Sequence, residues 1–103
     1  MKTLKTVARG VDLLNERVPG WEDKINLDKL DISSTCNCVC GQVAKRQGKF
    51  WSRFRNGLNI LGLELNQAEE YGFDCYGRIG YDRLDDEWSK VIRAKRRGEE
   101  ITA

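Results

Sequence analysis

The sequence has 103 residues, which is the length of one ordinary domain and too short for two independently stable cores. Hydrophobic residues make up 40% of it and charged residues 33%, a balance that excludes a disordered polypeptide and predicts a globular domain with a solvated surface. The 18 basic and 16 acidic residues leave a net charge of +2, which does not by itself indicate a polyanionic partner.

The distribution of apolar residues and the amino-acid composition bear on the compartment and the chemistry of the protein. The start of the sequence carries no apolar run of signal-peptide length, and nowhere do about eighteen apolar residues follow one another. We therefore expect a cytoplasmic protein without a membrane span, whose four cysteines are free thiols. Histidine is absent, which excludes Ser-His and Cys-His catalytic pairs within the chain.

The first predicted element is an amphipathic helix from about Thr3 to Val18. Its apolar residues recur at steps of three and four, namely Leu4, Val7, Ala8, Val11, Leu14 and Val18. Pro19-Gly20 ends this helix, because proline disfavours helical geometry in the residue before it. The next segment, 21–32, has a mixed spacing that favours a helical turn followed by an extended piece.

A second helix is predicted from about Thr35 to Gln47. One face of it carries Cys36, Val39, Cys40 and Val43, and the hydroxyl residues at 33–35 offer its N-cap. Gly48 ends this helix, and the aromatic-basic stretch 49–55 is expected to form a short helix before Asn56-Gly57 turns the chain. For the apolar run 58–65, a strand and a buried loop with a helical turn both remain open.

The remaining sequence predicts one short helix and one long one. Asn66 is expected to cap a helix over 67–71 that Gly72 ends in the left-handed conformation, with Phe73 packing back against it. After a loop over 74–80, a helix is predicted from about Tyr81 to Arg97. Its first turns are acidic and its last turns basic, as the helix dipole favours. Residues 98–103 are expected to form a polar tail.

Together these elements predict a mostly α fold, a small single-domain helical bundle of three main helices plus one or two short helices over residues 1–103. The sequence has no internal repeat and no linker of domain-separating composition. The core is expected to form from apolar residues at helical spacing, without help from disulfides.

The cysteines suggest a metal site or a nucleophile as well as core packing. Cys36, Cys38, Cys40 and Cys75 would together supply the four thiolates of a structural zinc site, but their spacing lacks the pairs that usually converge on the ion. In a helix only Cys36 and Cys40 share a face, which favours these two as small core hydrophobes and disfavours zinc. Cys36 or Cys38 would suit a nucleophile near a helix N-terminus, although no histidine is present to act as its base.

Gly41 and Gln42 follow the cysteines inside the second predicted helix. A glycine there costs about 1 kcal/mol relative to alanine, which indicates close approach of another helix or of a ligand. Gln42 can both donate and accept hydrogen bonds. Tight helix packing with a solvent-facing amide is the favoured interpretation, and a ligand pocket is the alternative.

The stretch 45–55 combines five basic residues with three aromatic ones and no acid. Cations that bind phosphates and rings that stack on bases are typical of nucleic-acid-binding surfaces, and a small phosphorylated ligand would use the same groups. The helical spacing of the rings favours core aromatic residues beside a solvated basic face. Trp51, Arg53 and Arg55 are the candidate binding residues of this stretch, which the basic end of the last helix would extend into one positive face.

Five stretches of the sequence together resemble a known group of proteins. They are 13–21, 27–31, the cysteine stretch 36–42, Tyr71-Gly72-Phe73 and the final helix with Trp88 and its basic end. Over about Ala8 to Arg96 the chain resembles uncharacterised small proteins encoded by actinobacteriophages and related prophages. The resemblance implies an accessory phage product in the cytoplasm of a bacterial host, and it implies no activity. In that group a Leu often replaces Cys40 and Cys75 has no regular counterpart, which disfavours zinc further.

We expect a non-enzymatic phage accessory protein that binds a host protein or a small signalling ligand, with counter-defence as its role. The alternatives are a nucleic-acid-binding regulator that uses the stretch 45–55 and a small structural zinc-binding protein, and an enzyme is the least favoured. The candidate binding residues are Cys36, Cys38, Gly41, Gln42, Trp51, Arg53 and Arg55. The identity of the partner and the association of copies through an exposed apolar stripe stay open.

Overall fold

The computed structural model describes residues 1–44, 53–75 and 80–103 of the chain. Its elements, in order, are α1 (Lys5–Arg17), the 3₁₀-helix η1 (Trp21–Lys24), α2 (Val39–Ala44), α3 (Arg53–Ile60), the 3₁₀-helices η3 (Leu65–Gln67) and η4 (Glu69–Tyr71), and α4 (Tyr81–Arg96). The mostly helical prediction is confirmed, with three longer α-helices. In the described part, none of the helices is long and apolar enough to cross a bilayer.

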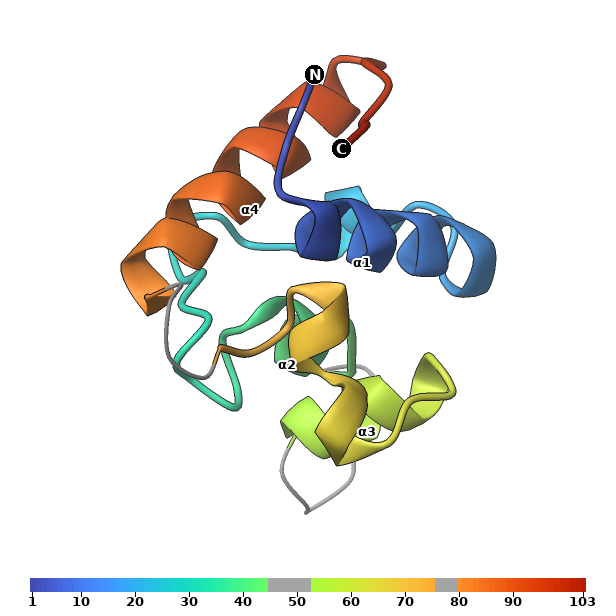
Figure 1. Cartoon of the computed structure of the whole chain (residues 1–103), viewed down its shortest axis with the longest axis vertical. Coiled ribbons are helices and arrows are strands. Elements are labelled where there is room, and N and C mark those ends of the chain that lie inside the picture. Colours follow the sequence, from blue (N-terminus) through green and yellow to red (C-terminus); the bar gives the residue numbers. More distant parts are fainter. Residues whose placement is uncertain (45–52, 76–79) are drawn as a thin grey trace.

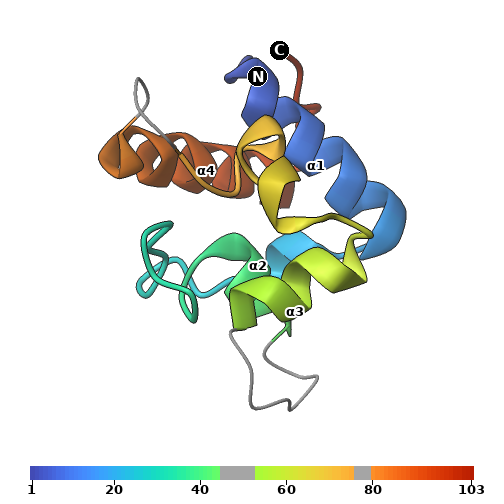
Figure 2. The ribbon, with the colours of Figure 1, turned by 60° about the horizontal axis from the view of Figure 1, so that its bottom comes forward.

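The four α-helices lie in two pairs. Figures 1 and 2 show α1 and α4 at one end of the molecule and α2 beside α3 at the other. The most extensive packing between two elements is that of α2 on α3. One continuous hydrophobic core joins the two pairs, so the pairs do not form separate units.

The helix α1 follows the predicted stripe closely, starting two residues later and ending one residue earlier than expected. Val7, Val11 and Leu14 are buried on its inner face. Gly10 lies on the same face, where an added Cβ would come within 2.2 Å of the Tyr71 carbonyl oxygen. The close approach of η4 therefore explains a glycine that helix propensity alone disfavours.

Trp88 lies at the centre of α4 and is fully buried. Its indole Nε1 donates a hydrogen bond to the carbonyl oxygen of Gly72 at 2.6 Å. The ring stacks on Phe73 at a centroid distance of 5.5 Å and meets Trp21 edge to face at 5.9 Å. Gly72 has a φ of 72°, which confirms the predicted left-handed end of the short helix. Phe73, predicted to pack back against that helix, donates its N–H to the Ala68 carbonyl oxygen at 3.0 Å, while its ring stacks on Trp88 of α4.

The chain between α1 and α2 is also fixed by α4. Residues 21–24 form η1, which confirms the predicted helical turn, but the chain then continues in turns rather than in the predicted extended piece. Asp85 on α4 accepts a hydrogen bond from the backbone N–H of Ile32 at 2.6 Å. Burial and the nearby carboxylates of Asp31 and Asp82 raise the pKa of Asp85 above its ordinary value, although the hydrogen bond lowers it.

The helix α2 is shorter than the predicted Thr35–Gln47. Residues 35–38 form turns, in which the Ser34 hydroxyl oxygen accepts a hydrogen bond from the N–H of Asn37 at 3.1 Å. Serine, a favoured capping residue, thus satisfies the backbone before the helix rather than at its first turn. The rest of the predicted helix, Gly48 and the start of the predicted short helix at 49–55 lie outside the described residues.

The predicted turn at Asn56-Gly57 is wrong, because both residues lie inside α3. A Cβ on Gly57 would lie 2.2 Å from the carbonyl oxygen of Cys40 on α2. Glycine is therefore required here for the contact between two helices and does not mark a break in one. Asn-Gly is a strong local turn signal, and this long-range contact overrides it.

The apolar run 58–65 contains the end of α3, a turn and the start of η3. The helical-turn alternative is confirmed and the strand alternative is wrong. Gly62 makes the turn with a φ of 74°. The predicted cap Asn66 is also wrong: η3 starts two residues earlier than predicted, at Leu65, and its cap is Glu64, whose N–H donates a hydrogen bond to the Gln67 side chain at 2.9 Å.

Residues 98–103 do not extend as a tail, which corrects the prediction for them. The N–H of Thr3 donates a hydrogen bond to the carbonyl oxygen of Thr102 at 2.9 Å. The N–H of Thr102 donates to the carbonyl oxygen of Met1, also at 2.9 Å. Ile101 packs against the core. Figure 1 shows the two ends of the described chain side by side. Backbone pairing satisfies polar groups that the sequence pattern alone left to solvent.

We expect Gly57→Ala to destabilise the protein by about 1–3 kcal/mol, because the added methyl group has no space beside the Cys40 carbonyl. Chemical denaturation measures the change. Gly80→Ala is the control, since a Cβ at Gly80 meets no atom within 4 Å. A Gly57→Ala variant as stable as the wild type, which helix propensity alone would favour, contradicts the expected clash.

We expect Asp85→Asn to stabilise the protein at about pH 7 by less than about 1 kcal/mol, because asparagine keeps the acceptor for Ile32 and removes a disfavoured charge. The raised pKa in the folded state means that the Asp85 contribution is most favourable at low pH and declines as the pH rises above about 4. Denaturation at several pH values should show the two proteins converging in acid. Asp85→Ala, which leaves the Ile32 N–H without its acceptor, should be less stable than both at neutral pH.

Candidate functional site

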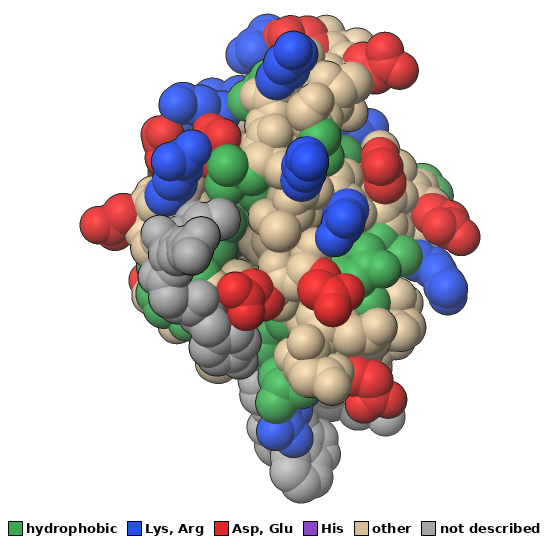
Figure 3. All heavy atoms as spheres, viewed as in Figure 1, with side chains coloured by type: hydrophobic (Ala, Val, Ile, Leu, Met, Phe, Trp, Pro, Cys, Tyr) green, Lys and Arg blue, Asp and Glu red, His purple; other side chains and the backbone are tan. Residues whose placement is uncertain are grey.

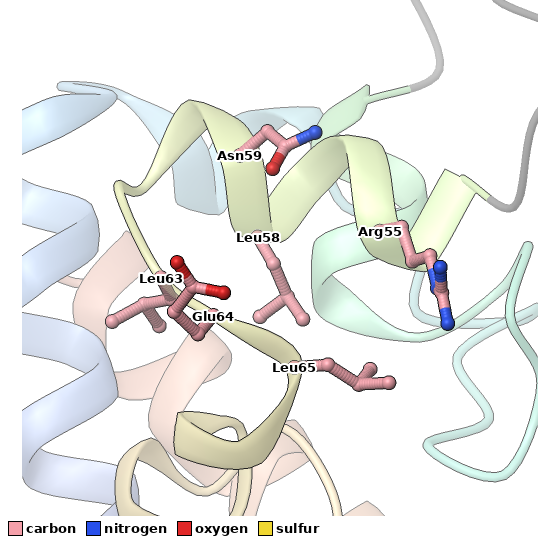
Figure 4. A pocket seen from close by; sticks show the side chains of 6 residues that line it. All are labelled: Arg55, Leu58, Asn59, Leu63, Glu64 and Leu65. Atoms are coloured by element: carbon pink, nitrogen blue, oxygen red, sulfur yellow. The ribbon is translucent and has the colours of Figure 1, made fainter.

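A pocket of about 260 Å³ lies between α3 and the segment that follows it. We call it the α3 pocket. Its lining residues are Arg55, Leu58, Asn59, Leu63, Glu64 and Leu65. Figure 4 shows that they come from α3 on one side and from the 63–65 segment on the other.

The wall of the α3 pocket is made by three leucines from three successive local structures. The N–H of Leu63 donates to the carbonyl oxygen of Leu58 at 2.9 Å, which folds the chain back on the end of α3. Leu58 and Leu63 are buried, whereas 42% of Leu65 is exposed. Because an exposed leucine adjoins two buried ones, the apolar interior is continuous with the surface at this point.

Two opposite charges accompany these leucines. Arg55 and Glu64 are both exposed, and no ion pair joins them or occupies either one within the described ranges. In Figure 4 their side chains lie on opposite sides of Leu58. Glu64 forms a capping box with Gln67: its N–H donates to the Gln67 side chain, and its own side chain accepts from the backbone at Gln67. The pocket thus offers an apolar wall with one cation and one anion, and Asn59 adds an exposed amide.

The cysteines of the second predicted helix divide differently from the prediction. Cys38 and Cys40 are fully buried and Cys36 is exposed. The prediction of a core position is therefore correct for Cys40 and wrong for Cys36. The reason is the late start of α2: Cys36 lies in the preceding turn, where helical spacing does not set its direction.

The chemistry of Cys38 argues against a nucleophile. Its sulfur accepts a hydrogen bond from the N–H of Gly41 at 3.2 Å, yet burial raises the pKa of the thiol to about 11. At about pH 7 only about one molecule in ten thousand would carry the thiolate. Burial also raises the pKa of Cys40 and, with the nearby carboxylates, that of Cys75.

The four thiols predicted as the alternative zinc set do not come together as a metal site. In the described ranges, no group of three or more cysteine, aspartate or glutamate side chains could hold a metal ion. Cys36 faces solvent while Cys38 and Cys40 face the core. Their placement fits the uneven spacing noted in the sequence, which does not present converging pairs.

Gly41 and Gln42 are structural residues here. A Cβ on Gly41 would lie 2.3 Å from the Thr35 carbonyl oxygen, so the close approach comes from the preceding turn rather than from another helix or a ligand. Gln42 is buried, which makes the predicted solvent-facing amide wrong. Its Oε1 accepts from the N–H of Asn26 at 2.6 Å, and its Nε2 donates to the carbonyl oxygens of Asn26 and Asn37.

The basic-aromatic candidates are only partly described. Trp51 lies outside the described residues, and Arg53 is half-buried at the start of α3. Of the six candidates that the structure describes, Arg55 alone lines the α3 pocket. The prediction missed Leu58, Leu63, Glu64 and Leu65, because a reversal of the chain brings them together and no regular spacing marks it. The density of leucine in 58–65 is the one signal that pointed there.

Three of the basic residues at the end of α4 are engaged within the protein, whereas Arg93 is exposed. Arg96 donates hydrogen bonds to the carbonyl oxygens of Glu22 and Ile25. Lys95 pairs with the Glu22 carboxylate at 3.7 Å, and Arg97 pairs with Glu99 at 2.6 Å. Figure 3 shows basic and acidic side chains interspersed on the face in view. The predicted positive face that would include the end of α4 therefore gains little support.

Comparison with known proteins found no matching family model, no similar curated protein and no similar solved structure.

We expect Gln42→Leu to destabilise the protein by about 2–4 kcal/mol, because it leaves the polar backbone groups of Asn26 and Asn37 without their partner. Thermal and chemical unfolding measure the loss. Gln67→Ala, which removes one exposed hydrogen bond to Glu64, is the control and should change stability by less than about 1 kcal/mol. Equal effects of the two substitutions would contradict the structural role of Gln42.

Proposed function

We propose that the chain is a non-enzymatic binding protein that holds a host protein at the α3 pocket. The observation that carries the proposal is the exposed Leu65, which continues the buried leucines Leu58 and Leu63 out to the surface. An apolar side chain of a partner that covers Leu65 and fills the pocket removes this surface from water. Each Å² of apolar area so removed contributes about 25 cal/mol to binding.

The size of the pocket favours a protein partner over a small signalling ligand. Pockets that enclose small molecules usually measure about 300–1,000 Å³, and this one measures about 260 Å³. It suits one apolar side chain of a partner better than a whole ligand. Signalling ligands that carry phosphates would also meet the Glu64 carboxylate beside the single cation Arg55, which disfavours them.

The chemistry of the chain favours binding over catalysis. The sequence contains no histidine, and the buried Cys38 is protonated at neutral pH. Exposed Cys36 has no histidine to act as its base. The resemblance to actinobacteriophage proteins adds the context of this proposal: an accessory product that occupies a bacterial host protein, with blunting of a defence system as the consequence.

Photocrosslinking in an actinobacterial host tests the proposal. A photoreactive amino acid that replaces the exposed Asn59 should give a discrete protein adduct, and one that replaces the exposed Arg93 of α4 should not give it. Adding Leu65→Ser to the Asn59 probe should remove most of the adduct. Because Leu65 is already 42% exposed, the unfolding temperature should change little.

The same adducts from both positions, or an adduct that Leu65→Ser leaves unchanged, would refute binding at the α3 pocket. An adduct to nucleic acid rather than protein would promote the regulator hypothesis based on the stretch 45–55.

A further inference from the structure

We infer that the α3 pocket selects a partner segment in which an apolar side chain is flanked by an acidic residue on one side and a basic residue on the other. The inference deepens the proposed function and rests on it. Its basis is the placement of Arg55 and Glu64 on opposite sides of Leu58, next to the exposed Leu65. The apolar side chain supplies contact area, and the two charges of the pocket determine which flanking residues fit.

Both charges of the pocket are available to pair with a partner. Three cations at the end of α4 are held by the protein itself: Lys95 by Glu22, Arg97 by Glu99, and Arg96 by backbone carbonyls. No described ion pair holds Arg55 or Glu64. Both are exposed, so a partner residue can pair with either without first breaking an internal ion pair.

The opposite signs of the two pocket charges determine which flanking residues of a partner are favoured. A segment with acids on both sides of its apolar residue would pair with Arg55 but place a like charge near Glu64, and a segment with two basic flanks would do the reverse. Exposed ion pairs contribute about 0.2–1 kcal/mol each, and like charges oppose binding by similar amounts. Exchanging one favourable contact for an unfavourable one should therefore weaken the binding of the peptide segment by at least about twofold.

A set of four synthetic peptides tests the inference. Each carries a central leucine between alanines, with two further residues at each end. The mixed-charge peptide has Glu-Glu at one end and Lys-Lys at the other, and the remaining three have Glu-Glu, Lys-Lys or Gln-Gln at both ends. Binding is followed by amide chemical shifts of the full-length protein, which also localise the peptide. We expect saturable shifts at Leu58, Leu63 and Leu65, and the mixed-charge peptide should bind at least about twofold more tightly than either single-sign peptide.

Charge substitutions make the test sharper. Arg55→Glu turns both pocket charges acidic and should transfer the preference to the peptide with two basic flanks. Glu64→Lys should transfer it to the peptide with two acidic flanks. Arg93→Glu and Asp12→Lys make the same changes in net charge at exposed positions outside the pocket, and they should keep the wild-type preference.

Three outcomes would overturn the inference: no saturable shift with any peptide at millimolar concentration, equal binding of the mixed and single-sign peptides, or a preference that follows net charge in the control variants. Each of these is distinguishable from failure of the proposed function. The proposed function fails only if the Asn59 adduct is missing, appears equally from Arg93 or is insensitive to Leu65→Ser.

Discussion

The buried indole of Trp88 contacts several parts of the chain that are far apart in the sequence. Its N–H holds the Gly72 carbonyl, and its ring contacts Trp21 and Phe73 and approaches the position where a Gly10 side chain would stand. Two helices, a 3₁₀-turn and the end of η4 are thereby placed around one side chain. A hydrogen bond inside a close-packed apolar site is directional as well as stabilising, so it fixes which groups meet and not only how much area is buried.

The α2–α3 pair depends on contacts of a different kind. Gly57 lets α3 approach the Cys40 carbonyl, and Gln42 binds the backbone at Asn26 and Asn37. Because the α3 residues that line the pocket lie on either side of Gly57 along the helix, the shape of the pocket follows from where this contact sets α3. The binding residues Arg55 and Glu64 therefore occupy the surface of a segment whose interior is tightly constrained, which is the arrangement that a preformed binding site needs.

Elements whose conformation is determined by their own residues could be predicted from the sequence. Elements whose conformation is determined by contacts with distant segments could not. The stripes of α1 and α4 and the left-handed Gly72 are local patterns, and all three were predictable. Asn56-Gly57 was misread because a contact between helices, which no local pattern shows, decides its conformation. The same holds for Gln42. Of the α3 pocket only Arg55 was predicted, since the fold-back at Gly62 has no periodic signature.

Because one of the clustered thiols is exposed and two are buried, the reactivity of the cysteines reports local unfolding of this part of the protein. Cys36 is accessible to an alkylating reagent in the native state, while Cys38 and Cys40, two and four residues later, are sealed. Reaction of Cys40 requires α2 to separate from its neighbours, and reaction of Cys38 requires the turn before α2 to open. The delay between alkylation of Cys36 and alkylation of the two buried thiols, followed by mass spectrometry, therefore measures how often this part of the chain opens. Hydrogen exchange gives the same kind of information, but alkylation is irreversible.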